Sequence, residues 1–199
     1  MGSLVMYSAE VSRDLIPVLM GLDQSTYYHC IRVQKLAMTI GQALGLGRQE
    51  LATLRLGALL HDVGKQGIPA HILLKPGRLT AEEREVMEGH STLGCDMTKQ
   101  LDLDVKTQVQ EIIQNHHLWY NGKGGYPRTN HGSRPSLLAQ IASVADVIDA
   151  MMEDRPYRKG LSLQASLDFL LERSGSQFSP LVVQCASAVL TSVPVVAGF

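Results

Sequence analysis

Residues 49–65 read QELATLRLGALLHDVGK. Apolar residues at positions 51, 54 and 58 recur at the spacing of one helix face, and this face leads directly to His61 and Asp62. An aspartate buried without a partner costs on the order of several kcal/mol, and this cost is relieved if the carboxylate coordinates a cation. The stretch therefore predicts a buried helix that ends at a polar, cation-binding site.

Helical spacing also marks the segments on either side of this stretch. Apolar or semi-buried residues at 29, 33, 36, 37, 40 and 44 predict a helix over 26–44, which ends at Gly45 and Gly47. Thr80 and Glu83 form a capping box ahead of another helix. The expected elements are an opening helix at 11–20, helices at 26–44 and 49–62, a loop at 63–79, helices at 81–100, 104–117, 135–152, 162–173 and 179–191, and a glycine-rich loop at 121–135. Because no segment shows sustained strand alternation, the predicted fold class is all-α, with residues 1–199 in a single domain.

The amino-acid composition limits the classes of protein to which this chain can belong. The 199 residues are 45% apolar and 19% charged, which is typical of one well-packed domain. A net charge of -1 gives no reason to expect binding to a nucleic-acid polymer, although a local cationic pocket could hold a small anion. The chain has no apolar run of about 18 residues and no basic leader, so neither a membrane span nor a signal peptide is expected. Cys30, Cys95 and Cys185 are widely spaced, which favours reduced thiols in a cytoplasmic protein.

Histidine and aspartate end or interrupt several of the predicted apolar helix faces. The residues concerned are His29, His61, Asp62, His90, His116, His117 and Asp146. Each one alone is as often a hydrogen-bonded core residue, but imidazoles and carboxylates without a thiolate together suit Fe, Mn or Zn. Seven such groups are too many for one tetrahedral site and fit two ions that share a bridging carboxylate. His71 and His131 lie in loops near Pro or Gly and are expected to be solvated.

Four short motifs follow one another along the chain. They are His61-Asp-Val-Gly-Lys65, Gly125-Tyr126-Pro127, Asp146-Val-Ile-Asp-Ala150 and Arg155-Pro-Tyr-Arg158. Together they resemble the HD-GYP family, a branch of the HD superfamily of metal-dependent phosphohydrolases. The resemblance covers residues 23–183, which is most of the chain.

The resemblance implies a helical bundle of the HD type that holds two divalent metal ions. One ion would be held by His29, His61, Asp62 and Asp146, and the other by Asp62, His90, His116 and His117, with Asp62 as the bridge. Fe or Mn is the expected metal, with Zn, Ni and Mg as alternatives. Some family members have a carboxylate four residues before the first histidine that supports a third metal. Ser25 stands at that position here, so two ions are expected.

The resemblance also implies a phosphodiesterase that hydrolyses cyclic di-GMP, a bacterial second messenger, to pGpG and onward to GMP. Asp62 and Lys65 are the expected catalytic residues. A hydroxide bridging the two ions would attack phosphorus, while Lys65 would stabilise the phosphate charge or protonate the leaving group. Lys65, Arg155 and Arg158 would contact the phosphate, and the Gly-Tyr-Pro loop is an expected surface for a protein partner.

Several alternatives stay open from the sequence alone. Another HD-type phosphohydrolase, acting on a nucleotide or on a mixed cyclic dinucleotide, would use the same core, and so would a catalytically silent metal-containing signalling module. Lys65 could pair with a nearby carboxylate, Arg155 could cap a helix end, and Arg158 could be a solvated charge. Leu118 replaces the glutamate common in the family, and the loop before Tyr126 is one residue longer. Both departures bear on partner contacts and substrate preference. The chain could also be a stand-alone enzyme or a fragment of a longer protein.

Overall fold

The computed structural model describes residues 15, 17–99, 106–154 and 159–192. Within these ranges the regular elements are helices, and the β-type pairings are two isolated bridges, Leu118 with Gly125 and Ser174 with Phe178. The elements are α2 (Gln24–Ala43), α3 (Arg48–Leu60), η1 (Val63–Gly67), α4 (Ala70–Leu73), α5 (Ala81–Glu88), α6 (His90–Thr98), α7 (Lys106–Asn115), η2 (Arg128–Asn130), α8 (Leu137–Met152), α9 (Leu163–Glu172) and α10 (Pro180–Ser192). The all-α fold class expected from the sequence is confirmed.

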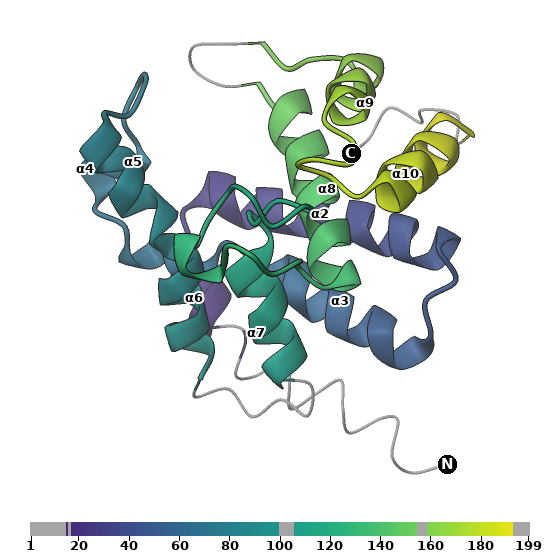
Figure 1. Cartoon of the computed structure of the whole chain (residues 1–199). Coiled ribbons are helices and arrows are strands. Elements are labelled where there is room, and N and C mark those ends of the chain that lie inside the picture. Colours follow the sequence, from purple (N-terminus) through teal and green to yellow (C-terminus); the bar gives the residue numbers. More distant parts are fainter. Residues whose placement is uncertain (1–14, 16, 100–105, 155–158, 193–199) are drawn as a thin grey trace.

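The main hydrophobic core lies where α2 packs against α3 and α8 (Figure 1). Val33, Ala37 and Ile40 face this core from α2, and Leu54 and Ala58 face it from α3. Residues of α8, α9 and the segment through α10 complete it: Ile141, Val144, Ala145, Ile148, Leu167, Leu170, Phe178, Val182, Val183 and Ala186. Each large aliphatic side chain buried there contributes about 1.5–3 kcal/mol, so this core fixes α2 and α8 against each other.

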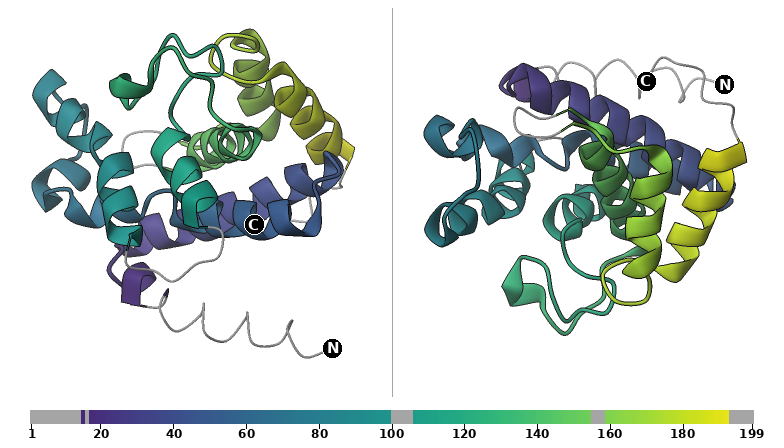
Figure 2. Two further views of the ribbon diagram at one scale, coloured as in Figure 1. Left: turned by 60° about the horizontal axis from the view of Figure 1, so that its bottom comes forward. Right: turned by 90° about the horizontal axis from the view of Figure 1, so that it is seen from above.

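Two close approaches bring α6 and α7 onto the same framework. A Cβ on Gly57 of α3 would lie 2.4 Å from Ile112 Cδ1 of α7, so the missing side chain allows these helices to meet. A Cβ on Gly64 of η1 would lie 1.8 Å from the His90 carbonyl oxygen of α6. Residues 61–65 therefore lie against α6. The helices α4 and α5 lie at one edge of the molecule, and α9 and α10 lie at the opposite edge (Figures 1 and 2).

Helix ends follow local signals in the sequence. Asp23 begins α2 by accepting a hydrogen bond from the Thr26 backbone N–H at 3.1 Å. The expected capping box of Thr80 and Glu83 is present and begins α5.

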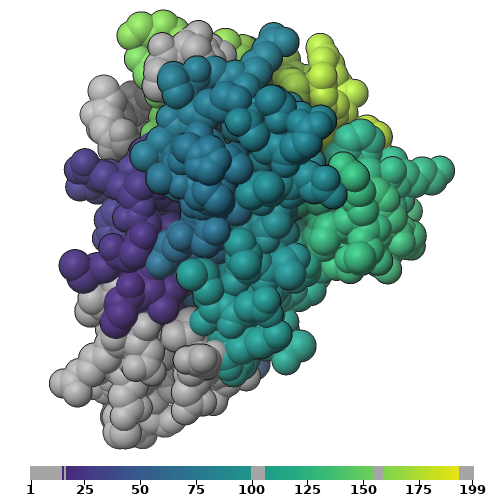
Figure 3. Space-filling view, turned by 90° about the vertical axis from the view of Figure 1, so that its left-hand side faces the viewer, coloured from purple at the N-terminus to yellow at the C-terminus, as the bar shows by residue number. Residues whose placement is uncertain are grey.

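Seen from the side of α4 and α5, the space-filling view shows these helices over the middle of one face, with α2 on one side and the loop after α7 on the other (Figure 3). Among the described helices, none combines the length and hydropathy needed to cross a bilayer.

Two expectations about helix boundaries are wrong. Residues 63–79, expected to be a loop, contain the 3₁₀ helix η1 and the short helix α4. The helix expected at 81–100 is divided at Gly89, which ends α5 and precedes α6. The Gly89 N–H bonds to the Val86 carbonyl at 3.1 Å, which tightens the last turn of α5 and changes the direction of the chain. His90 consequently begins α6. The expected opening helix at 11–20 lies partly outside the described residues; within this range residues 15 and 17–20 are described, and all of them are helical.

Candidate metal centre

Histidine and aspartate side chains from five parts of the chain meet beside the core. They come from α2 (His29), the turn after α3 (His61 and Asp62), the start of α6 (His90), the turn after α7 (His116 and His117) and α8 (Asp146). Their potential ligand atoms form two groups, Asp62 with His90, His116 and His117, and His29 with His61 and Asp146, and within each group all atoms lie within 4.8 Å of one another. All seven side chains selected from the sequence are thus brought together.

Asp62 lies between the two groups and directs one carboxylate oxygen toward each. Its Oδ2 lies 3.5 Å from His29 Nε2 and 3.4 Å from His61 Nε2. Its Oδ1 lies 3.3 Å from His90 Nε2. Asp146 Oδ1 lies 3.1 Å from His29 Nε2 and closes the first group. A carboxylate with one oxygen directed toward each group is able to bridge two ions.

Hydrogen bonds hold four of the five imidazoles in a common orientation. In His61, His90 and His116, Nδ1 donates to the backbone carbonyl three residues earlier, at 2.8, 2.8 and 2.9 Å. In His29, Nδ1 instead contacts Asp149 Oδ2 at 2.7 Å. Because a carbonyl oxygen only accepts, Nδ1 carries a proton in the first three rings, and Nε2 is the nitrogen that offers a lone pair when the ring is neutral. The fold therefore presents Nε2, the nitrogen able to bind a metal, to the centre.

Two buried atoms at the centre show that its residues fit a metal ion. His61 Nε2 and Asp62 Oδ1 are buried and have no hydrogen-bond partner among the described residues. Leaving such atoms unpaired costs about 1–3 kcal/mol each, and a bound cation would satisfy both. Imidazole nitrogens and carboxylate oxygens are donors that suit Fe, Mn and Zn. The donor chemistry and the unpaired atoms therefore agree with a divalent metal site.

The two groups differ in their protonation. Burial lowers the pKa of His90 and of His116, and it lowers the pKa of His117 to about 3. These three imidazoles are neutral at pH 7, which is the form that binds a metal. Burial opposes protonation of His29 too, but its hydrogen bonds to Asp146 and Asp149 outweigh that effect and raise its pKa to about 9. In the metal-free protein, a proton on His29 balances part of the carboxylate charge.

Lys65 reaches the centre from η1. Its Nζ lies 2.5 Å from Asp62 Oδ2, so the ion pair with a nearby carboxylate, considered above as an alternative role, is present. Burial disfavours the charged Lys65, but the charge of Asp62, its hydrogen bond with Lys65 and the charge of Asp146 together outweigh this and raise the lysine pKa. Burial opposes the ionisation of Asp62, but the charge of Lys65, together with the interactions of His61 and His90, outweighs it and holds the pKa of that carboxyl well below its usual range. Both groups are therefore ionised at neutral pH, and a cation already lies at the centre.

Comparison with known proteins identifies the family. Residues 13–182 match the family model described as HD domain. The chain belongs to the HD domain family. A cyclic di-GMP phosphodiesterase of Thermotoga maritima is 36% identical over 162 residues, which cover 81% of this chain and 44% of that protein. A cyclic di-GMP phosphodiesterase response regulator of Xanthomonas campestris is 35% identical, over 80% of this chain and 41% of its own length. This HD domain thus spans less than half the length of these curated relatives, and the expected HD-GYP resemblance is confirmed.

Solved structures share the fold of this HD domain. An HDG"Y"P protein from Bdellovibrio bacteriovorus aligns with a TM-score of 0.66 at 22% identity, over 86% of this chain and 55% of that one. The HD domain of the phosphodiesterase PgpH from Listeria monocytogenes aligns with a TM-score of 0.63 at 15% identity, over 88% of this chain and 95% of that one. At these identities the likeness supports the helical HD fold and nothing finer.

The sequence reasoning missed the role of Asp149 in this HD domain. Besides contacting His29, Asp149 accepts two hydrogen bonds from Arg32, at 2.7 and 2.9 Å, and Arg32 also pairs with Glu153 at 2.7 Å. Asp149 is buried one helical turn after Asp146, and this spacing within an apolar helix was the available signal. The carboxylate fixes the ring of His29 in the way that outer carboxylates orient metal-binding histidines.

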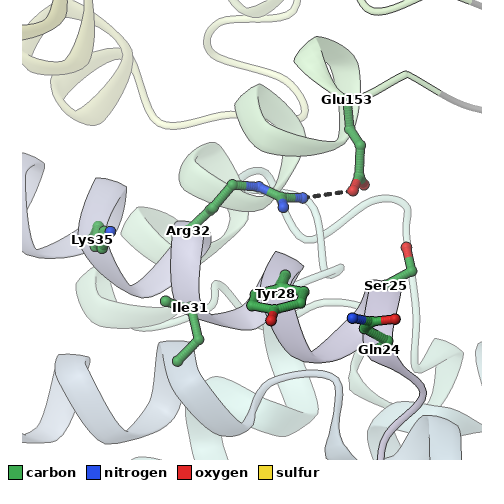
Figure 4. A pocket seen from close by; sticks show the side chains of 7 residues that line it. All are labelled: Gln24, Ser25, Tyr28, Ile31, Arg32, Lys35 and Glu153. Carbon is green, nitrogen blue, oxygen red and sulfur yellow. Dashed lines mark ion pairs between the residues drawn. The ribbon is translucent and has the colours of Figure 1, made fainter. Parts of the chain in front are cut away.

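An open pocket adjoins this network on the outer face of α2. Its volume is about 590 Å³, and it is lined by Gln24, Ser25, Tyr28, Ile31, Arg32, Lys35 and Glu153. Figure 4 shows the Arg32–Glu153 pair at one side of the pocket and Tyr28 facing it from α2. Ser25 and Arg32 lie four residues before and three residues after His29, so they stand at the border between the outer face of α2, which lines the pocket, and the inward face that carries His29. Solvent thus approaches the outer end of the network that holds His29.

The remaining candidates from the sequence have varied outcomes. Arg155 and Arg158 lie outside the described residues, so their expected contacts with phosphate stay predictions. His71 and His131 are exposed, as expected. His131 Nε2 lies 3.0 Å from the Gly125 carbonyl oxygen, and this contact belongs to the loop rather than to the centre.

Proposed function

We propose that this HD domain is a metal-dependent phosphodiesterase that hydrolyses cyclic di-GMP to pGpG, with GMP as the product of a second cleavage. The observation that carries the proposal is the pair of adjoining His/Asp groups that share Asp62. Two-metal sites with a shared carboxylate are typical of enzymes that hydrolyse phosphate esters. The relatives named as cyclic di-GMP phosphodiesterases, at 33–36% identity, support this substrate.

The proposal gives each group one divalent ion, Fe or Mn by preference, with Zn, Ni or Mg as alternatives. The first ion would be held by His29, His61 and Asp146, the second by His90, His116 and His117, and both by Asp62. When bound, such a pair of ions supplies Lewis acidity and lowers the pKa of a water molecule at neutral pH. The neutral state of His90, His116 and His117 supports metal binding at the second group near pH 7.

In this proposal Lys65 acts on the substrate. Its ammonium group is held at the centre by Asp62, and a phosphodiester beside Asp62 would lie within its reach. The positive charge would stabilise the charge that develops on the non-bridging oxygens, or the ammonium would give a proton to the leaving 3′ oxygen. Arg155 and Arg158 are proposed to bind phosphate from the segment after α8.

A mixed cyclic dinucleotide is the second candidate substrate. Relatives from Vibrio cholerae named as 3'3'-cGAMP-specific phosphodiesterases are 29–35% identical to this chain. Because the metal groups would serve either dinucleotide, the choice between substrates would depend on contacts outside them. A catalytically silent module is less well supported, since all seven candidate ligands are present and gathered. A protein partner at the Gly-Tyr-Pro loop and a cytoplasmic location stay predictions.

A substrate panel tests the proposal. Anaerobically prepared protein loaded with Fe(II) or Mn(II) would be given cyclic di-GMP, 3'3'-cGAMP, pGpG and simple nucleotides, with products separated by liquid chromatography. We expect the largest kcat/KM for cyclic di-GMP, and loss of turnover in Asp146→Ala. A larger kcat/KM for 3'3'-cGAMP would favour the second candidate. Metal-loaded protein that cleaves none of these compounds would contradict an enzymatic role on them.

A further inference from the structure

His117 is held differently from the other four histidines of the centre. Each of the other rings has its Nδ1 fixed by a carbonyl or carboxylate oxygen. Neither ring nitrogen of His117 has a hydrogen-bond partner among the described residues. An imidazole without such an anchor is free to rotate about its side-chain bonds unless packing holds it. Something other than a hydrogen bond must therefore orient His117.

Aromatic contacts surround the His117 ring. Its centroid lies 4.0 Å from that of His116 and 4.4 Å from that of Tyr126, with the Tyr126 ring inclined by only 35°. The Tyr126 ring also meets His90 edge-on, at 5.9 Å and 83°. Ring pairs at these separations attract one another and favour particular orientations. Tyr126 thus contacts two of the three histidines in the second group.

The backbone around Tyr126 is built to bring the ring to this place. Gly125 has a φ of +79°, which favours glycine, and a Cβ on it would lie 2.0 Å from the His117 carbonyl oxygen. The Trp119 N–H donates to the Gly124 carbonyl at 3.0 Å, and the Tyr126 N–H donates to the His117 carbonyl at 3.3 Å. Residues 124–126 therefore close directly onto residues 117–119, and Tyr126 comes to lie against His117.

We propose that Tyr126 is a positioning residue that fixes the His117 ring for metal binding, in place of the Nδ1 hydrogen bond that orients the other histidines. The inference rests on the proposed function only in that the Asp62, His90, His116 and His117 group holds a metal ion. Packing of the ring, rather than its hydroxyl group, supplies the effect. Phenylalanine at position 126 should therefore suffice, whereas an aliphatic side chain should not.

The test compares three variants of the full chain. Tyr126→Leu removes the ring, Tyr126→Phe keeps it, and Tyr120→Leu is the matched control, since Tyr120 belongs to the same loop but faces Arg134 at 4.9 Å. Mn(II) binding would be followed by electron paramagnetic resonance of free Mn(II). We expect Tyr126→Leu to weaken one of two binding steps by about 10- to 100-fold, as for other residues that orient metal ligands, while the other two variants match the wild type. Two unchanged binding steps in Tyr126→Leu would overturn the proposal, and so would an equal loss in Tyr126→Phe.

A second measurement needs no metal. In metal-free protein labelled with ¹⁵N-histidine, the His117 ring nitrogens should give one sharp set of signals in the wild type and in Tyr126→Phe. The signals should be averaged or broadened in Tyr126→Leu, while those of His61 and His116 stay unchanged and report intact folding. Identical His117 signals in all variants would overturn the proposal. A wild type that binds no metal would contradict the proposed function instead, and this measurement would still decide the role of Tyr126.

Discussion

Replacing Asp149 with asparagine tests how the first metal group is held. Asp149→Asn keeps the shape of the side chain and removes its charge, so that the contacts with His29 at 2.7 Å and with Arg32 at 2.7 and 2.9 Å are no longer charge-assisted. Loss of a residue that orients a metal-binding histidine weakens metal binding by about 10- to 100-fold, which corresponds to about 1.4–2.7 kcal/mol. We expect a loss of this size in one of the two binding steps and no change in the other.

Calorimetric titration of metal-free protein with Mn(II) would measure this loss, with Asp168→Asn as the control. Asp168 is exposed and accepts a hydrogen bond from Gln164, so its replacement should leave both binding steps unchanged. Acid denaturation supplies a second readout. Burial opposes ionisation of Asp149, but its hydrogen bonds with His29 and Arg32 lower its pKa. The stability that it adds is therefore present above its unfolded pKa of about 3.9 and is lost as the pH falls through the lower folded value. Equal Mn(II) affinity in wild type and Asp149→Asn would refute the reasoning.

Three further changes have defined outcomes. Gly57→Ala places a methyl group against Ile112 in the α3–α7 contact and should destabilise the protein by about 1–3 kcal/mol in urea unfolding; an unchanged midpoint would show that the contact relaxes freely. Lys65→Met removes the ammonium group beside Asp62 and should lower kcat for cyclic di-GMP by about 100- to 1,000-fold, while two ions stay bound. A kcat within threefold of the wild-type value would show that Lys65 does not act in the mechanism. Burial raises the pKa of the Cys95 thiol to about 11, so iodoacetamide should label this thiol at pH 8 about a hundredfold more slowly than an ordinary thiol. Peptide mass spectrometry would measure the labelling rate, and labelling at the ordinary rate would contradict the buried environment of Cys95.

The helices and the candidate ligands were predictable because both depend on local patterns. A 3.6-residue repeat of apolar positions marks the buried face of a helix, and an imidazole or carboxylate on that face is conspicuous. His29 and Asp146 were found in this way, and the structure places both at the centre. The break at Gly89 was missed because apolar residues continue on both sides of it, and a single glycine within a helical pattern is often tolerated.

The supporting contacts were not predictable, because they join residues that are far apart in the sequence. Asp149 lies 120 residues after His29, and its spacing from Asp146 indicates a buried position but does not identify Arg32 or the Nδ1 atom of His29 as its partners. The sequence predicts a surface for a protein partner at the loop of Tyr126 and does not show where the ring of Tyr126 packs. Its contact with His117 depends on the φ angle of Gly125 and on the bridge between Leu118 and Gly125. Spacing along the chain thus identifies candidate ligands, whereas the residues that orient them emerge only from tertiary structure.

The central claim is that Asp62 joins two metal ions into one hydrolytic site. The most direct test measures metal content and cyclic di-GMP hydrolysis together, in anaerobically loaded wild type and in Asp62→Ala. The account predicts two ions per chain with turnover in the wild type, and loss of turnover together with at least one ion in the variant. A wild type without bound metal, or an Asp62→Ala variant that hydrolyses cyclic di-GMP at the wild-type rate, would contradict it.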